Sequence, residues 1–315
     1  MENSAPAAFL REDSRVALAA CGEDRVSFLQ GMLTNDIASL RPNEGVAALL
    51  LTEQGRITAS LNVFCEEERL LLDLEAEAAA RLEPGLAKFI VADDVEFESA
   101  EKVSLALYGA EAVAQLGKLV EGTLPAEEGA HALVKMAGCS VMAARLTATE
   151  PAMFRVFAAS DRDATTICDA LEQAGWAPLD DSAADAWRIS VGLAREGVDY
   201  DGETLAPEVP SLAPAISFRK GCYLGQEVVE RVAARGKVNW LVQAMSLEAP
   251  VPAGSELQSE GRVVGRLSSV APGDGEVAAI ARVRREIVEE RISVEATGSS
   301  GIVRGMAVAQ AASEE

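Results

Sequence analysis

The stretch VAALLLTEQGRITASLNVF (46–64) contains two strand-like segments, 46–52 and 56–64, on either side of the tripeptide EQG. Apolar and β-branched residues that flank a short polar turn with a glycine are typical of a β-hairpin. Other elements are expected on both sides of it: a strand at 14–19 and a helix at 22–33 before it, and a strand at 70–74 and a helix at 75–89 after it. The hydrophobic periodicity of this region therefore predicts a β-α-β-β-β-α unit.

The same order of elements recurs directly afterwards. Strands are expected at 103–109, 132–136, 140–146 and 153–158, and helices at 110–120 and 160–175. Ser160 is the expected N-cap of the last helix, with Asp163 at the capping-box position and Gly175 at its C-terminal end. The repeat is indicated by the order of the elements alone, and not by sequence identity.

The rest of the chain has a different character. A helix is expected at 183–194, and the proline-containing stretch 195–217 predicts a long irregular connection. From residue 238 onward, short alternating segments separated by PAG, PGDG and TGSSG predict a small β-barrel. The sequence thus predicts an α+β fold with a first region at 1–238 (two related βαβββα-type units at about 1–98 and 99–180 and a connecting segment at 181–238) and a C-terminal β-barrel domain at 239–315.

Composition argues against several classes of function. The 315 residues include 28 Lys and Arg against 50 Asp and Glu, and this net charge of −22 argues against direct binding to nucleic acid or to an anionic membrane. The only histidine, His131, cannot form a His-rich zinc site by itself. Five cysteines, no two closer than 29 residues, match no metal-binding spacing and indicate reduced thiols in a cytoplasm. We therefore expect a cytoplasmic protein without a metal site or a membrane span.

The densest group of reactive and polar side chains is FRKGCYLGQEVVER (218–231). It combines a lysine, a thiol, a phenol, an amide, a carboxylate and an arginine with two glycines that permit close backbone approach. Residues 219–291 hold 11 Lys and Arg and 10 Asp and Glu, so this segment is not acidic. Reactive and polar side chains gathered in one loop favour a functional site that binds a small anionic ligand. The alternative is a polar turn without a functional role, beside a barrel surface of mixed charge.

The element K-G-C-Y-L-G-Q-E followed by Arg231 resembles the signature of YgfZ-type proteins, folate-binding paralogues of the glycine-cleavage T-protein, an aminomethyltransferase. Further stretches resemble the same superfamily: GEDRVSFLQGMLTNDI (22–37), LLLTEQGRITASLNVF (49–64), WRISVGLAREGVDY (187–200) and GRVVGRLSSV (261–270). The resemblance implies a GcvT-like folate-binding fold, with two α+β units and a barrel around a channel that receives tetrahydrofolate or a derivative. It also implies a role in iron–sulfur cluster assembly or repair and, through it, in tRNA thiolation. Folate and iron–sulfur client or assembly proteins are the expected partners.

The resemblance also implies which residues hold the ligand. The expected folate-binding residues are Lys220, Gly221, Tyr223, Gly225, Gln226, Glu227, Arg231 and Glu208. Cys222 is the expected functional thiol, because the neighbouring cations Arg219 and Lys220 favour its thiolate form. The alternative is a buried thiol that only packs the loop.

Two departures from the T-protein pattern bear on the reaction. Ala59 and Ser60 stand where the T-protein carries adjacent aspartates, one of them central to aminomethyl transfer. Ser190 stands where it has a pterin-binding glutamate, and Glu208 is the expected substitute. A positioned carboxylate that manages a proton typically contributes about 10²- to 10⁴-fold in rate. The departures therefore predict that aminomethyl transfer is absent.

Three functional hypotheses follow. The first is a tetrahydrofolate-binding accessory protein for iron–sulfur cluster assembly or repair, without aminomethyltransferase turnover. The second is a folate-dependent one-carbon transferase that uses another acid, Asp36 or Asp73. The third is a scaffold that has lost its ligand. Folate binding separates the first two from the third, and turnover with an aminomethyl donor separates the second from the first.

Overall fold

A computed structural model describes residues 7–109, 112–146, 153–235, 238–273, 275–290, 292–296 and 299–303. The chain divides into two compact units, and each combines segments that are distant in the sequence. Unit 1 comprises Met1–Leu50, Thr58–Asp181 and Pro214–Leu224. Unit 2 comprises Leu51–Ile57, Ser182–Ala213 and Gly225–Glu315. The motif at 218–231 therefore contributes its first half to unit 1 and its second half to unit 2.

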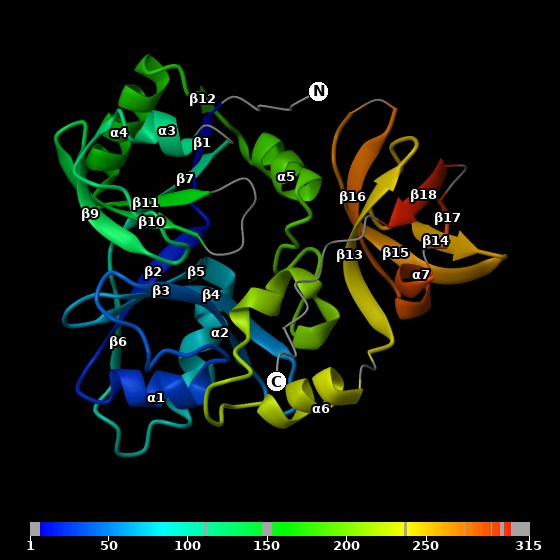
Figure 1. The fold of residues 1–315 in the computed structure, drawn as a ribbon, viewed down its shortest axis with the longest axis horizontal. Coiled ribbons are helices and arrows are strands. Elements are labelled where there is room, and N and C mark those ends of the chain that lie inside the picture. The colour runs from blue at the N-terminus through cyan, green and yellow to red at the C-terminus, as the bar shows by residue number, and fades with distance from the viewer. Residues whose placement is uncertain are drawn as a thin grey trace. The chain divides into compact units, whose positions relative to one another are not determined.

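Unit 1 contains a five-stranded sheet with the strand order β3-β4-β5-β2-β6 (Figure 1). Its elements are β2 (Arg15–Cys21), α1 (Arg25–Met32), β3 (Gly45–Leu51), β4 (Ile57–Cys65), β5 (Leu70–Glu75), α2 (Ala76–Ala87) and β6 (Glu96–Ser99). Leu29 of α1, Leu72 of β5 and Leu82 of α2 belong to one buried apolar core. Both helices therefore contribute apolar side chains to the core of this sheet.

The second sheet of unit 1 has seven strands in the order β12-β1-β7-β11-β10-β9-β8. Its elements are β1 (Ala8–Arg11), β7 (Val103–Tyr108), α3 (Ala112–Leu116), β8 (Val120–Glu121), β9 (His131–Met136), β10 (Cys139–Arg145), β11 (Phe154–Ala158), α4 (Asp161–Gln173) and β12 (Ala177–Pro178). The Ser160 hydroxyl oxygen accepts a hydrogen bond from the backbone N–H of Asp163, and Gly175 has a φ of +88°. Both ends of α4 are thus capped as predicted.

The predicted repeat is confirmed by the strand orders of the two sheets. β3-β4-β5-β2 in one sheet matches β9-β10-β11-β7 in the other, and each sheet carries two helices at the corresponding places in the chain. The strands β1, β6, β8 and β12 were not predicted. The helix predicted at 110–120 is shorter, because α3 ends before Gly117, and residues 110 and 111 lie outside the described part of the chain.

Unit 2 contains the predicted barrel, drawn in yellow to red in Figure 1, which closes in the order β13-β16-β15-β14-β17-β18. Its strands are β13 (Trp240–Leu247), β14 (Glu256–Ser259), β15 (Arg262–Val270), β16 (Val277–Arg284), β17 (Val294–Ala296) and β18 (Ser299–Val303). The other elements after β12 are α5 (Asp181–Ser190), the short turns of 3₁₀ helix at Ala206–Glu208 and Pro210–Ala215, α6 (Gln226–Arg235) and α7 (Arg285–Glu289). Among the described residues, no helix is both long and apolar enough to cross a membrane.

Candidate functional site

The first half of the motif, residues 218–224, is fixed to the end of helix α1. The ammonium of Lys220 donates hydrogen bonds to the backbone oxygens of Gln30, Leu33 and Asn35, at 2.5, 2.7 and 2.9 Å. The backbone N–H of Leu224 donates to the oxygen of Gly31 at 3.1 Å. Since the last carbonyls of a helix lack intrahelical partners, Lys220 caps the C-terminal end of α1.

These hydrogen bonds give Lys220 a structural role, which is to attach the loop to the end of α1. Only 9% of the residue is exposed, and its three N–H groups are all used by backbone oxygens. Burial lowers the pKa of Lys220 to about 8, and the nearby Asp36 carboxylate opposes this shift. The ring of Tyr223 lies 5.3 Å from the ammonium and is itself buried. Both residues are expected ligand-binding residues; in the structure the three donors of the Lys220 ammonium are used by backbone oxygens, and Tyr223 is buried beside it.

Gly221 and Cys222 form the exposed part of the loop. The structure has five free cysteines, and Cys222 is the exposed one. A Cβ atom built on Gly221 meets nothing within 4 Å, so no close contact requires glycine there. The Cys222 thiol is accessible to solvent, and the interpretation of a buried thiol that only packs the loop is therefore wrong.

The second half of the motif packs on the hairpin turn between β3 and β4. Gly225 has a φ of +82°, and a Cβ atom there would lie 2.5 Å from the backbone oxygen of Thr52. Gly55, in the turn, has a φ of +76°, and its Cβ would lie 2.8 Å from Val228. Only glycine permits both conformations at these distances. The two glycines thus bring helix α6 directly against the turn.

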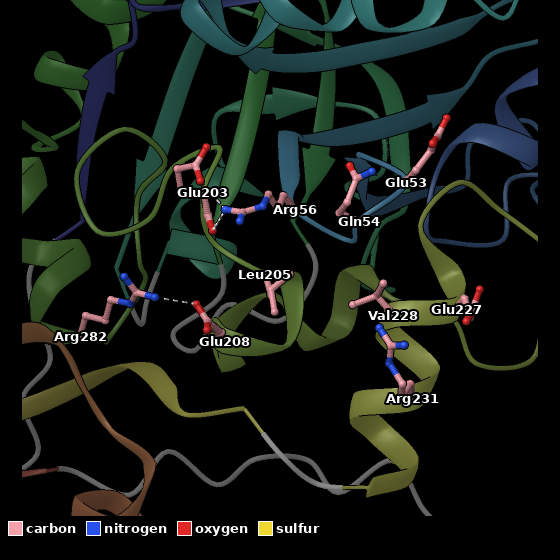
Figure 2. A pocket seen from close by; sticks show the side chains of 10 residues that line it. All are labelled: Glu53, Gln54, Arg56, Glu203, Leu205, Glu208, Glu227, Val228, Arg231 and Arg282. Atoms are coloured by element: carbon pink, nitrogen blue, oxygen red, sulfur yellow. Dashed lines mark hydrogen bonds and ion pairs between the residues drawn. The ribbon is translucent and has the colours of Figure 1, made fainter.

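A cavity of about 720 Å³ opens in unit 2 where the turn, the connection after α5, helix α6 and strand β16 meet (Figure 2). It is lined by Glu53, Gln54, Arg56, Glu203, Leu205, Glu208, Glu227, Val228, Arg231 and Arg282. Its volume lies within the range of small-molecule sites, roughly 300–1,000 Å³. Of the predicted residues, Glu208, Glu227 and Arg231 meet in this cavity.

The carboxylate of Glu208 is the most enclosed charge of the cavity. Its side chain is 9% exposed, and it accepts a hydrogen bond from Arg282 at 3.1 Å. Burial raises the pKa of Glu208 above its usual value, and the Arg282 guanidinium opposes this shift. Across the cavity, Arg56 pairs with Glu203, a largely exposed side chain. Glu208 is thus a carboxylate held by one cation and facing an open volume (Figure 2).

Helix α6 presents Glu227 and Arg231 to the cavity, one turn apart. In the described part of the chain, Arg231 has no carboxylate within salt-bridge distance. The amide of Gln226 donates to Glu230 at 2.6 Å, and Gln226 is not among the lining residues. Sequence reasoning missed Arg56 and Arg282, which lie far from the motif. Arg56 could have been found from its place beside the turn, whereas Arg282 carries no local signal.

The two acids considered for a one-carbon transferase lie in unit 1. Asp73 is fully buried and accepts two hydrogen bonds from Arg15 at 3.0 Å, one from Arg155 at 2.5 Å and one from Asn62 at 3.0 Å. The arginines lower its pKa to about 2 despite the opposing effect of burial. Such an enclosed, ionised carboxylate cannot exchange a proton with a substrate. Asp36 accepts a hydrogen bond from the Gln30 side chain at 2.9 Å.

The structure also shows the surroundings of the three positions that depart from the T-protein pattern, 59, 60 and 190. Ala59 is fully buried in the apolar core of the five-stranded sheet, whereas Ser60 points to the opposite face of β4. The Ser190 hydroxyl donates to the backbone oxygen of Trp187 at 2.6 Å, at the exposed end of α5. None of the three supplies a carboxylate, and position 59 has no polar surroundings in which to hold one.

Comparison with known proteins gives relatives in two groups. No protein-family profile matches the chain. An aminomethyltransferase from Nostoc sp. is 24% identical over 294 residues, covering 89% of this chain and 78% of the relative. The tRNA-modifying protein YgfZ from Photobacterium profundum is 26% identical over 237 residues, covering 73% and 67%. The crystal structure of the glycine cleavage system aminomethyltransferase T from Bartonella henselae superposes with a TM-score of 0.83 at 20% identity, covering 97% and 87%. This structural match confirms the predicted fold.

Proposed function

Because this chain is a YgfZ-type paralogue in the aminomethyltransferase superfamily, we propose that it is a tetrahydrofolate-binding accessory protein. We place the pterin end of the folate in the cavity of unit 2, beside Glu208. The role proposed for the complex is in iron–sulfur cluster assembly or repair, with tRNA thiolation as an indirect consequence.

The observation that carries the folate proposal is the enclosed carboxylate of Glu208. The pterin ring presents a ring N–H and an exocyclic amino group side by side, and a carboxylate accepts such a donor pair with two parallel hydrogen bonds. Arg282 holds Glu208 from one side and leaves acceptor capacity on the other. Leu205 and Val228 supply apolar surface for the ring faces. Glu208 thus takes the role expected for the missing glutamate at position 190.

The anionic end of the ligand requires a cation. Arg231 lines the same cavity from helix α6 and has no carboxylate within salt-bridge distance among the described residues. A guanidinium matches the geometry of a carboxylate, and the pair gains strength where water is partly excluded. Glu208 therefore provides the negative charge for the pterin donors, and Arg231 provides the positive charge for a glutamyl carboxylate.

We propose that the protein does not carry out aminomethyl transfer. Ala59 and Ser60 supply no carboxylate, and Asp73 is held ionised between Arg15 and Arg155. Restoring an aspartate at position 59 would place a charge in an apolar core, which costs several kcal/mol. The measurement is ammonia release from an aminomethylated carrier in the presence of tetrahydrofolate. Robust release by the natural sequence would refute this part of the proposal.

The folate proposal is tested by calorimetric titration with tetrahydrofolate under anaerobic conditions. Loss of a charged hydrogen-bond acceptor costs about 1.5–3 kcal/mol, so Glu208→Gln is expected to weaken binding about 10- to 100-fold. Glu203→Gln is the matched control, since it removes the same charge from a largely exposed side chain of the same cavity. We expect this control to bind within about threefold of the natural protein. Absence of binding at millimolar folate would overturn the proposal.

The iron–sulfur part of the proposal rests on the resemblance and on the exposed thiol of Cys222. An accessible thiol can exchange with a thiol partner or donate to a cluster intermediate. The test is the activity of an iron–sulfur enzyme in a deletion strain that expresses either Cys222→Ser or the matched variant Cys168→Ser. We expect only the first to fail. Equal rescue by both variants and by the natural protein would remove Cys222 from the function.

A further inference from the structure

A second groove lies in unit 1, between helix α2 and strand β6 at the edge of the five-stranded sheet, and has a volume of about 610 Å³. We call it the β6 groove. Its apolar lining comes from both elements and from the loop that joins them: Ala80, Pro84, Ala87, Ile90, Val95 and Phe97. The next residue of that loop, Val91, is 89% exposed. Apolar surface gathered in this way is typical of a site that binds another protein.

The outer side of β6 has backbone groups that another strand could use. β6 is the last strand of its sheet, and within the described ranges it pairs only with β2. The N–H of Ala100 donates to the oxygen of Ala17 on β2. Since every second residue of an antiparallel strand bonds to the same neighbour, Phe97 and Ser99 direct their backbone groups away from β2. This edge is therefore a template for an added strand.

The opposite edge of the same sheet is occupied by the chain itself. At β3, the N–H of Thr34 donates to the oxygen of Leu49 at 3.0 Å, and the Thr34 hydroxyl oxygen accepts from the N–H of Leu49 at 2.8 Å. Leu33 and Leu50 form a bridge beside this contact. In the part of the chain that the structure describes, β6 is thus the open edge of this sheet.

The charge of the β6 groove is negative. Three exposed carboxylates line it, and no cation does: Glu83, Glu96 and Glu98. Among the described residues, none of the three lies within salt-bridge distance of a cation. Arg81 of α2 donates to the backbone oxygen of Thr58, and Arg69 pairs with Glu66. Because complementary charge selects the partner of a surface, the groove favours a basic occupant.

We propose that the β6 groove receives an extended basic segment of a partner protein, which adds a strand to β6. The chain supplies no such segment from its ends, because residues 1–6 and 304–315 together contain one arginine and three glutamates. A second copy of the chain is disfavoured by the net charge of −22. The inference goes beyond the folate proposal, since the groove lies in unit 1 and the cavity beside Glu208 lies in unit 2.

The groove also predicts the residue pattern of the segment. Phe97 packs against the apolar core that α2 shares, whereas Glu96 and Glu98 alternate with it and lie on the opposite face of β6. Side chains of an added strand lie beside those of the strand it pairs with. The segment should therefore alternate apolar residues, over the groove, with lysine or arginine beside the carboxylates.

The probe is a fluorescent octapeptide of alternating lysine and valine, titrated with the full chain by anisotropy in dilute buffer. An octapeptide of alternating lysine and proline has the same charge but cannot pair as a strand. For the natural protein we expect the lysine–valine peptide to bind about tenfold more tightly. Ser99→Pro removes an outward N–H of β6 and keeps the three carboxylates, so the preference should fall below about threefold.

Charge reversal is the second measurement, and it leaves the backbone of β6 unchanged. Glu98→Lys should weaken the lysine–valine peptide about tenfold. Glu121→Lys is the matched control, because it reverses an exposed carboxylate on β8, the edge strand of the other sheet of unit 1, and should change binding less than about threefold. Equal binding of the two peptides, or equal losses in the two charge variants, would indicate diffuse attraction to an acidic chain and overturn the proposal. Absence of binding at millimolar peptide would overturn it as well.

Discussion

Asp73 and Glu208 are both carboxylates paired with arginine, and their surroundings give them different tasks. Asp73 lies in unit 1 on the buried strand β5 and accepts four hydrogen bonds from Arg15, Arg155 and Asn62. Glu208 lies in unit 2 at the end of a 3₁₀ turn, has one arginine partner and borders a cavity. The pKa of Asp73 is lowered and that of Glu208 is raised.

The difference shows that the residue types alone do not distinguish a structural ion pair from a ligand site. A buried carboxylate whose lone pairs are all used has no capacity for a ligand, and it strongly favours one arrangement of its partners. A carboxylate with one partner and open space beside it retains acceptor capacity. The two kinds of carboxylate should therefore differ in how much their removal lowers the free energy of unfolding.

Asp73→Asn is expected to have the largest effect. The change leaves Arg15 and Arg155 in a buried region without the charge that balances them, although Glu12 still pairs with Arg155. Breaking a buried ion pair on one side costs about 3–5 kcal/mol, to be measured by urea unfolding. Asp13→Asn is the matched control, because Asp13 pairs with Arg11 and is 76% exposed, and it should cost less than about 1 kcal/mol. Equal losses would mean that burial does not separate the two kinds of pair.

Lys220→Met extends the comparison to cations within one motif. It removes the charged donor for the backbone oxygens of Gln30, Leu33 and Asn35, and we expect a loss of about 2–3 kcal/mol in the free energy of unfolding. Arg231→Gln, in the second half of the motif, should change stability by less than about 0.5 kcal/mol. If the two variants had similar stability and Lys220→Met weakened folate binding more, the structural assignment of Lys220 would be wrong.

The pKa of Asp73 predicts an acid-dependent loss of stability. The pKa is about 2 in the folded state against an ordinary value of 3.8. A lowered pKa contributes stability above the unfolded value, and this contribution is lost as the pH falls from about 4 toward 2. The shift corresponds to about 2 kcal/mol. Urea unfolding between pH 5 and pH 2.5 should show this loss in the natural protein and a smaller loss in Asp73→Asn. Parallel pH profiles would contradict the assignment.

The fold could largely be predicted from the sequence because its signals are local. The hairpin around EQG, the cap at Ser160 and the alternation of the barrel strands each arise from neighbouring residues. The strands β1, β6, β8 and β12 were missed because they are only two to four residues long and pair with segments distant in the sequence. Such strands are defined by their partners and leave no periodicity to detect.

The motif that borders the proposed site could be found from the sequence, but the surroundings of its residues could not. The motif at 218–231 was recognised, yet Lys220 is committed to backbone oxygens almost 190 residues earlier in the chain. A lysine that caps a helix and a lysine that binds an anion look the same in a sequence. Arg282 was missed for the related reason that its exposed position beside the cavity depends on the barrel register.

Glu208→Gln is expected to have the smallest effect on stability, and this result would complete the contrast with Asp73→Asn. Glutamine keeps an oxygen that can accept the hydrogen bond from Arg282, and that arginine is 46% exposed, so water can solvate its charge. The raised pKa means that folding disfavours the ionised form of Glu208, so removal of the charge lowers the free energy of unfolding only slightly. We expect the free energy of unfolding at pH 7 to change by less than about 1 kcal/mol, while folate affinity falls as described above. A loss of more than about 2 kcal/mol in urea unfolding would place Glu208 with Asp73 as a structural carboxylate, and a loss of folate affinity in that variant could then be ascribed to disruption of the cavity wall.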